Sequence, residues 1–99
     1  MAAARESKHA HGPSEAKTRV GVVRAVAKER RRLGARLLAM RLERELTREQ
    51  AAEVIGIHAV HVARIETGSA NVTIGTLVAV ALAYKVPLAA FFEALPETT

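Results

Sequence analysis

The amino-acid sequence predicts an all-α fold, because its apolar residues recur at helical intervals. In the first half of the chain, apolar residues recur at spacings of four and seven: Val22, Val26, Leu33, Leu37 and Met40. Two threonines, Thr47 and Thr73, precede later helical runs and are suited to cap them. The 99 residues are enough for one small domain with a tail, and with no cysteine and three aromatic residues its core is expected to be aliphatic.

The leading residues are expected to form a tail and a basic extension. Residues 1–14 contain Ala, His, Gly and Pro with scattered charge and no period, so we expect them to be disordered. Residues 15–32 predict a basic helical extension, which Ser14 could cap. The extension either continues straight into the next helix or forms a separate helix with a kink near Gly34, and both alternatives remain open at this point.

Residues 47–68 predict two short helices joined by a glycine turn. Thr47 and Gln50 have the spacing of a capping box, and Gly56 is suited to end the first helix with a positive φ. The first helix has an inward face of small residues, and the second buries one side through Ile57, Val62 and Ile65. This arrangement is a helix-turn-helix pattern, and its opposite side, with His58, Ala59, His61 and Arg64, is the candidate DNA-contacting face.

Residues 33–92 resemble the helix-turn-helix family of phage repressors and their bacterial relatives, the Xre or Cro/CI-like family. The resemblance rests on residues in the family's order and spacing: Leu33, Gly34, Leu37, Arg41, Leu46, Thr47, Ala52, Gly56, Val62, Ile65, Glu66, Gly68, Asn71, Leu77, Ala81, Val86, Phe91 and Phe92. It implies a five-helix repressor-like domain over residues 33–95, whose third helix enters the major groove of double-stranded DNA.

The resemblance also implies roles for individual side chains. Arg41 and Glu66 are expected to form a structural ion pair between the first and third helices. Arg48 is expected to contact a DNA phosphate, or to be an ordinary surface arginine. The loop after the third helix would bring further polar groups to phosphates, unless they serve only turn chemistry around Gly68; these are Thr67, Ser69 and Asn71.

The candidate DNA-contacting face departs from the family's usual pattern, since His58 replaces a Ser or Thr cap and few hydrogen-bond donors are present. Arg64 could donate two bonds to guanine, or remain exposed and pair with Glu43 or Glu45. His61 could donate to guanine or phosphate, and Ala59 or Val60 could contact a thymine methyl group. Sparse base contacts would leave part of the specificity to DNA shape, and the two histidines could make DNA binding sensitive to pH.

The positive charge is concentrated in the leading third of the chain. Residues 1–36 carry ten Lys or Arg against three Glu, whereas residues 37–99 carry five against seven, which gives +7 and −2 and the total of +5. Two interpretations are open: the basic stretch, with Arg30, Arg31 and Arg32, contacts phosphates, or it is a solvated leader and the body binds another protein.

The last third of the domain is expected to contain two helices. After Thr73, one helix would share a face of Ile74, Leu77, Val78, Ala81 and Tyr84. Pro87 would open a short fifth helix with an apolar repeat of Leu88, Phe91, Phe92 and Leu95. We expect this repeat to form a two-fold symmetric homodimer contact, with a filled monomer core as the alternative.

Other classes of function have little support in the sequence. There is no aspartate or cysteine, so neither an enzyme, a cofactor nor a metal site is predicted, even at His58 and His61 or at His9 and His11. No apolar run is long enough to cross a membrane and no secretory signal is present, so a cytoplasmic protein is expected.

Two functional hypotheses follow. The first is a sequence-specific transcriptional regulator, a repressor, that binds a palindromic operator as a dimer. The alternative is a protein-interaction module on the same scaffold, such as an antitoxin that masks a toxin or a coactivator. The basic leading third favours the first hypothesis and the acidic body favours the second.

Overall fold

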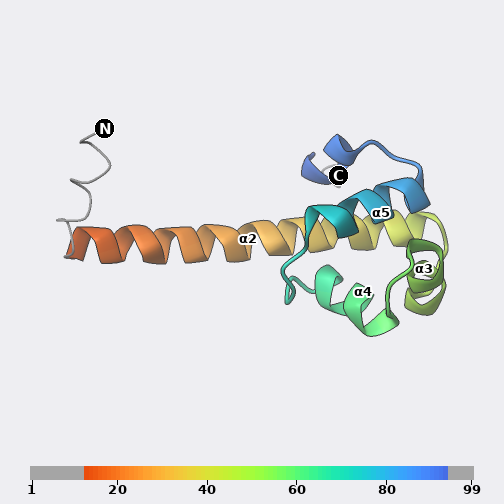
Figure 1. The fold of residues 1–99 in the computed structure, drawn as a ribbon, viewed down its shortest axis with the longest axis horizontal. Helices are drawn as coiled ribbons and strands as arrows, with labels where there is room; N and C mark the ends of the chain where they lie inside the picture. Colours follow the sequence, from red (N-terminus) through yellow and green to blue (C-terminus); the bar gives the residue numbers. More distant parts are fainter. Residues whose placement is uncertain (1–12, 94–99) are drawn as a thin grey trace, which may run out of the picture.

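The computed structural model describes residues 13–93, which form four α-helices and one 3-10 helix and contain no β-strand. Figure 1 shows their order along the chain: α2 (Pro13–Glu43), α3 (Arg48–Ile55), α4 (Ala59–Glu66), α5 (Ile74–Tyr84) and η2 (Leu88–Phe92). The expected all-α helix-turn-helix fold is present, but the expected fifth α-helix is a 3-10 helix. The tail expected at residues 1–14 lies outside the described residues, apart from Pro13 and Ser14.

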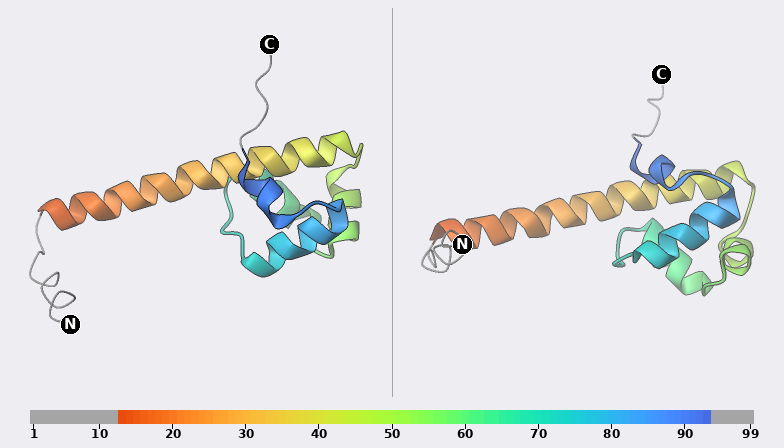
Figure 2. Two further views of the ribbon diagram at one scale, coloured as in Figure 1. Left: turned by 90° about the horizontal axis from the view of Figure 1, so that it is seen from above. Right: turned by 45° about the horizontal axis from the view of Figure 1, so that its top comes forward.

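Helix α2 is a single helix of 31 residues that continues without a break through Gly34. Of the two alternatives left open by the sequence, the continuous helix is therefore the correct one. Because α2 begins at Pro13, Ser14 is its second residue and does not precede it as a cap. The carboxyl-terminal half of α2 packs against the other helices, whereas residues 13–29, which we call the arm, project from them (Figure 2).

The core lies between the second half of α2 and the three later elements that cover it. It is aliphatic apart from Tyr84 and Phe91, and its buried members are Leu37, Met40, Ile65, Leu77, Val80, Ala81, Tyr84, Ala90 and Phe91. For α5 the expected inward face was partly wrong. Val80 is fully buried, whereas Ile74 and Val78 are exposed, because the buried positions follow an i, i+3, i+4, i+7 repeat from Leu77.

Two arginines, Arg36 of α2 and Arg44 directly after it, bind the later elements to this helix. Arg36 donates from Nε to the carbonyl oxygen of Ala90 at 3.0 Å and lies 3.4 Å from Glu93, which holds η2. Arg44 donates to the carbonyl oxygen of Tyr84 at 2.8 Å, and its guanidinium lies 4.9 Å from the centroid of the Tyr84 ring. Arg36 and Arg44 therefore hold η2 and the last residue of α5 against α2 and the turn that follows it.

Burial and the nearby negative charge of Glu66 raise the pKa of Tyr84 above its ordinary value, although Arg41 and Arg44 oppose this. The folded chain therefore holds the phenolic proton more tightly than the unfolded chain, and stability should fall as the pH rises above about 10. Tyr84 is the single tyrosine and there is no tryptophan, so tyrosinate absorbance follows this residue alone. We expect that absorbance to rise together with the loss of helical circular dichroism. Tyr84→Phe should remove the part of the alkaline transition that follows tyrosine ionisation.

Candidate nucleic-acid interface

The turn between α3 and α4 is built by local chemistry. Thr47 accepts a hydrogen bond from the Gln50 backbone at 3.0 Å, and the Gln50 side chain accepts one from the Thr47 backbone at 2.8 Å, which confirms the expected capping box. Gly56 ends α3 with φ +92°, and its N–H donates to the carbonyl oxygen of Ala52 at 2.8 Å. These two ends fix the direction in which α4 leaves α3.

Helix α4 packs one side on the body and leaves the other in solvent. Val62 and Ile65 are buried, and Ala51 and Ala52 of α3 are buried where the two helices meet, as expected for small residues at a close crossing. The outer face of α4 comprises residues that are exposed or half-buried: His58, Ala59, Val60, His61 and Arg64.

The side chains of the outer face make few interactions with the rest of the described chain. His58 takes the N-cap position with extended backbone, but its side chain makes no capping hydrogen bond. Val60 is 70% exposed. Within residues 13–93 the guanidinium of Arg64 has no ion pair, so the alternative pairing with Glu43 or Glu45 is not formed. The donors of this face are therefore free to meet a ligand.

Behind α4, the expected ion pair between Arg41 and Glu66 is formed and buried. Arg41 donates from Nε and Nη2 to the two carboxylate oxygens of Glu66 at 2.6 and 3.0 Å, and the side chains are 8% and 2% exposed. Nη1 of Arg41 donates to the carbonyl oxygen of Leu46 at 2.8 Å. The hydrogen bond to Glu66 is the main reason that the pKa of Arg41 is raised. The pair fixes the end of α4 to α2.

Arg48 joins this pair. Its Nε lies 3.3 Å from Oε1 of Glu66, while its side chain is 46% exposed at the start of α3. One carboxylate thus accepts hydrogen bonds from two arginines, a network that the sequence alone did not indicate. The exposed part of Arg48 leaves its phosphate contact as a prediction.

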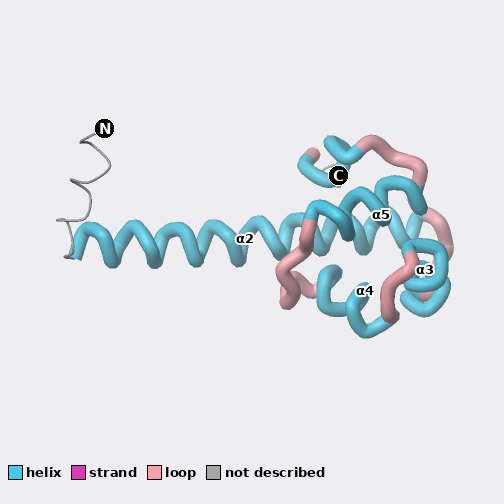
Figure 3. The backbone as a smooth tube through the Cα atoms, in the orientation of Figure 1, coloured by secondary structure: helices cyan, strands magenta, loops and turns pink. Residues whose placement is uncertain are grey.

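The loop between α4 and α5 (Figure 3) uses its polar groups internally. The Thr67 hydroxyl lies 3.0 Å from the carbonyl oxygen of Ala63 and 2.9 Å from the Ser69 hydroxyl, and Oδ1 of Asn71 accepts from Arg30 at 2.7 Å. The bonds of Thr67 and Ser69 correspond to the turn chemistry that was the alternative to phosphate contacts, whereas Asn71 joins the loop to α2 through Arg30. The contacts of Thr67, Ser69 and Asn71 with DNA stay predictions.

The three consecutive arginines of α2 have different surroundings. Arg30 is bonded to Asn71 and its Nε is buried without a partner, and Arg32 lies 3.6 Å from Glu29 in an exposed pair. Arg31 is exposed and lies against Gly68 in the loop after α4. Arg31 also continues an exposed row of cations along one side of α2, which we call the basic ridge: Lys17, Arg24, Lys28 and Arg31.

The expected dimer contact at the end of the chain is wrong for Phe91. Phe91 is 1% exposed and fills the monomer core, because η2 is turned against α2. Leu88 is half-buried against the same core, whereas Phe92 is exposed; Leu95 lies outside the described residues. The alternative, a filled monomer core, therefore holds for Phe91 and in part for Leu88.

Within residues 13–93, no three His, Cys, Asp or Glu side chains lie close enough together to hold a metal ion. His9 and His11 lie outside the described residues. No helix of the described part has the length and apolar character needed to span a bilayer.

Comparison with known proteins agrees with this geometry. The model of a helix-turn-helix family, HTH_3, matches residues 37–91, which is more than half of the chain. No curated protein matches the sequence.

Solved structures similar to this chain include the following three, each with 25% sequence identity. The restriction-modification controller protein C.AhdI from Aeromonas hydrophila has a TM-score of 0.64, and the match covers 66% of this chain and 98% of that protein. An HTH_3 family transcriptional regulator from Vibrio cholerae has a TM-score of 0.65, with coverage of 68% and 38%. The clp gene regulator ClgR from C. glutamicum has a TM-score of 0.61, with coverage of 65% and 83%. With the family match and the helix-turn-helix geometry of α3 and α4, the chain belongs to the HTH_3 helix-turn-helix family, as its resemblance to the Xre and Cro/CI-like proteins indicated.

Proposed function

We propose that this protein is a sequence-specific DNA-binding transcriptional regulator that inserts α4 into the major groove. The observation that carries the proposal is the outer face of α4, which is exposed and unpartnered while its other side is fixed by the core and by the pair of Arg41 and Glu66. A rigid helix with one free face is suited to a groove about 12 Å wide. Two of the similar structures belong to proteins described as regulators, and the third to a controller protein.

The side chains of the outer face suggest how bases would be distinguished. Arg64 would donate two hydrogen bonds to O6 and N7 of a guanine, and Val60 would contact the methyl group of a thymine. His58 and His61 lie at the amino-terminal end of α4, where they would donate to a base edge or a phosphate. With few donors on this face, the shape of the operator would supply the rest of the specificity.

The basic ridge would supply the phosphate contacts that the acidic body lacks. It begins at Arg31, beside the loop that ends α4, and continues along the arm away from the body. DNA that enters the outer face of α4 would therefore lie near the start of the ridge. This refines the expectation for the three arginines, since Arg30 and Arg32 already have partners within the chain.

We further propose that the regulator is a repressor that binds a palindromic operator as a homodimer. Two copies of α4 would then enter half-sites about 34 Å apart. Such an operator contains two identical half-sites in opposite orientation, which a two-fold symmetric dimer matches.

The change Arg64→Ala tests the role of α4. We expect affinity for the preferred site to fall roughly 10-fold to 100-fold, because a bidentate arginine contact contributes about 1–3 kcal/mol. Affinity for unrelated DNA should change little. The measurement is a mobility-shift titration with fragments selected from the genome. Equal losses on selected and unrelated DNA would contradict base recognition by Arg64.

The double change Arg24→Ala with Lys28→Ala replaces two members of the basic ridge. It tests the electrostatic contribution of the ridge to DNA binding. We expect binding to weaken by a similar factor on all sequences, and the slope of log K against log salt to fall by roughly 2. Arg32→Ala is the comparison within α2, since this exposed arginine already pairs with Glu29. An unchanged salt slope would mean that the ridge does not contact DNA.

The protein-interaction module stays the competing proposal, favoured by the net charge of −2 over residues 37–99. Weak DNA binding without sequence preference, together with a tightly bound partner protein, would support it over the regulator.

A further inference from the structure

The arm carries an apolar face that no element of residues 13–93 covers. Val20, Val22, Val23 and Val26 are 48%, 56%, 64% and 43% exposed, an unusual concentration of large apolar side chains on one solvent-facing helix. We call Val22, Val23 and Val26 the valine face, because they fall on one side of α2.

The valine face continues the stripe of α2 that packs on the core. Val23 and Val26 lie fourteen residues before Leu37 and Met40, and fourteen residues are close to four full turns of an α-helix. In the body this stripe is covered by α5 and η2, but in the arm it is bare. The same apolar stripe thus extends beyond the region where this chain can bury it.

The composition of the arm makes a bare helix costly. Residues 18–26 include a threonine, four valines and Gly21, all of which are weaker helix formers than alanine or leucine. The arm is the projecting part of the long helix α2, and packing of its apolar side would stabilise it, since most helical stability in proteins comes from such packing. A partner along the valine face would supply that packing.

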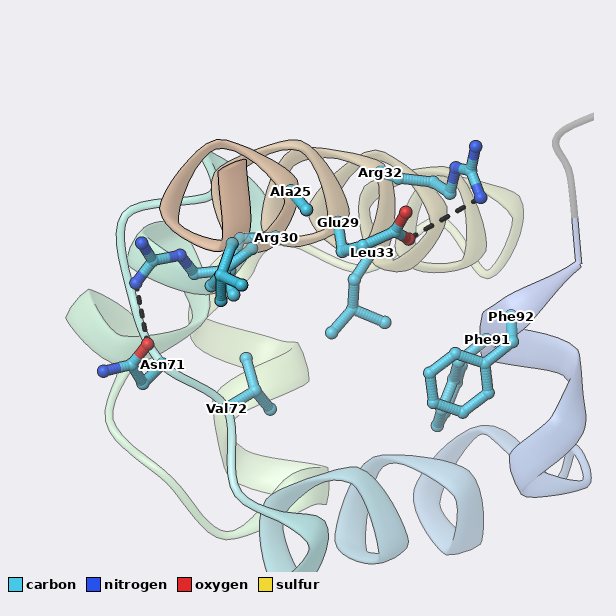
Figure 4. A pocket seen from close by; sticks show the side chains of 11 residues that line it. Ala25, Glu29, Arg30, Arg32, Leu33, Asn71, Val72, Phe91 and Phe92 are labelled. Carbon is cyan, nitrogen blue, oxygen red and sulfur yellow. Dashed lines mark hydrogen bonds and ion pairs between the residues drawn. The ribbon is translucent and has the colours of Figure 1, made fainter. Parts of the chain in front are cut away.

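A groove at the base of the arm indicates where that partner would lie. Figure 4 shows its lining side chains, which come from the arm and from the body and enclose about 620 Å³. The arm contributes Val22 and Val26, and the body contributes Val72 and the exposed Phe92. An occupant of this groove must contact the arm and the body at the same time.

We propose that the occupant is the arm of a second copy of this chain, packed antiparallel against the valine face. Charge decides the direction. A parallel pair would place Arg19, which lies on the valine face, beside its own copy. An antiparallel pair centred on Arg24 places Val22 opposite Val26 and Arg19 opposite Glu29, so that opposite charges meet at both ends. Glu29, which lies 3.6 Å from Arg32 in an exposed pair within the chain, would then contact Arg19 of the second copy as well. Arg30, on the same side of α2, is turned to Asn71.

This pairing also places both copies of α4 on one side of the dimer. Gly34, where α4 meets α2, lies about a quarter of a turn from the valine face at 3.6 residues per turn. The two-fold axis of an antiparallel pair is perpendicular to the plane that contains the two arms. A helix that lies above this plane in one copy therefore also lies above it in the other copy. Both α4 helices therefore lie on the same side of the dimer.

The spacing follows from the helix rise. Gly34 lies ten residues from Arg24, so the two copies of Gly34 are about 30 Å apart along the arms at 1.5 Å per residue. This is close to the roughly 34 Å that separates half-sites one turn apart. The agreement in spacing has meaning only if the protein binds DNA as proposed. The pairing of the arms does not depend on that proposal and can be measured without DNA.

The first experiment is sedimentation equilibrium of the full chain in the absence of DNA. The wild-type chain should be a dimer at micromolar concentrations, and Val23→Glu with Val26→Glu should raise the dissociation constant roughly 100-fold or more, because two carboxylates would be buried against apolar groups. Helical circular dichroism should fall as the arm loses its partner. Leu42→Glu is the matched control, since Leu42 is exposed on the opposite side of α2 and its change should leave the dimer intact.

The second experiment tests the direction of pairing. Arg19→Glu and Glu29→Arg should each weaken the dimer, and the two changes together should restore it. A monomer at high concentration with a fully helical arm would overturn the proposal. So would a dimer that survives the valine changes and dissociates with Leu82→Glu, because pairing would then use the exposed side of α5. Neither result alters the mobility-shift test of Arg64, so the two proposals fail separately.

Discussion

Replacement of Glu66 by alanine is expected to lower the stability of the domain by about 3–5 kcal/mol. The carboxylate is buried and accepts hydrogen bonds from Arg41 and Arg48, so its removal leaves the guanidinium of Arg41 in the interior without its charged partner. A small domain has a total stability of about 5–15 kcal/mol, and each kcal/mol shifts its melting temperature by roughly 4–8 °C. The midpoint of thermal unfolding should therefore fall by more than about 10 °C.

Three further variants separate the causes of this loss. Glu53→Ala removes an exposed carboxylate from α3 and should change stability by less than about 0.5 kcal/mol. Arg41→Met combined with Glu66→Leu removes both charges and should recover much of the loss, because apolar residues of similar size often replace a buried pair at little cost. Arg48→Ala should cost little, because Arg48 is half exposed.

The same variant connects folding with the proposed function. The pair holds the end of α4 against α2, so Glu66→Ala should weaken DNA binding and lower the melting temperature together. Denaturant unfolding followed by circular dichroism, with mobility shift at a temperature where the variant is folded, measures both. Unchanged folding in the variant would remove the ion pair from the account of how α4 is held.

Features that depend on a few neighbouring residues were predictable from the sequence. The capping box of Thr47 and Gln50, the turn at Gly56 and the cap at Thr73 all involve atoms within four residues of one another. The buried sides of α3 and α4 followed from the same short-range spacing. Local spacing was therefore sufficient to identify the side of α4 that faces solvent.

Features that depend on distant contacts were not predictable in this way. Arg36 and Arg44 reach carbonyl oxygens 54 and 40 residues away, and nothing in their local sequence marks them for that role. Helical spacing gives the centre of a buried face but not its width, so Ile74 and Val78 were assigned to the core in place of Val80. The close approach of the end of α4 to Gly34 is likewise a contact between residues far apart in the sequence.

The packing at Gly34 leads to a second large expected effect. Gly34 is buried in the middle of α2, and a Cβ atom there would lie 2.6 Å from the carbonyl oxygen of Glu66 and still closer to that of Ile65. Both obstacles are backbone atoms at the end of α4, which cannot rotate away as a side chain would. Gly34→Ala should therefore cost about 3 kcal/mol or more, at or above the upper end of the usual range for overpacking.

Gly21 provides a matched control in the same helix. A Cβ atom at Gly21 would meet nothing within 4 Å, so Gly21→Ala should stabilise the protein by up to about 1 kcal/mol through helix propensity alone. Thermal or urea unfolding of the two variants should thus give changes of opposite sign for the same chemical substitution. If Gly34→Ala were neutral or stabilising, α4 would not pack on α2 as closely as described, and Gly34 would serve only the helix. Because α4 is also the proposed DNA-contacting helix, Gly34→Ala should weaken DNA binding as well, whereas Gly21→Ala should preserve it.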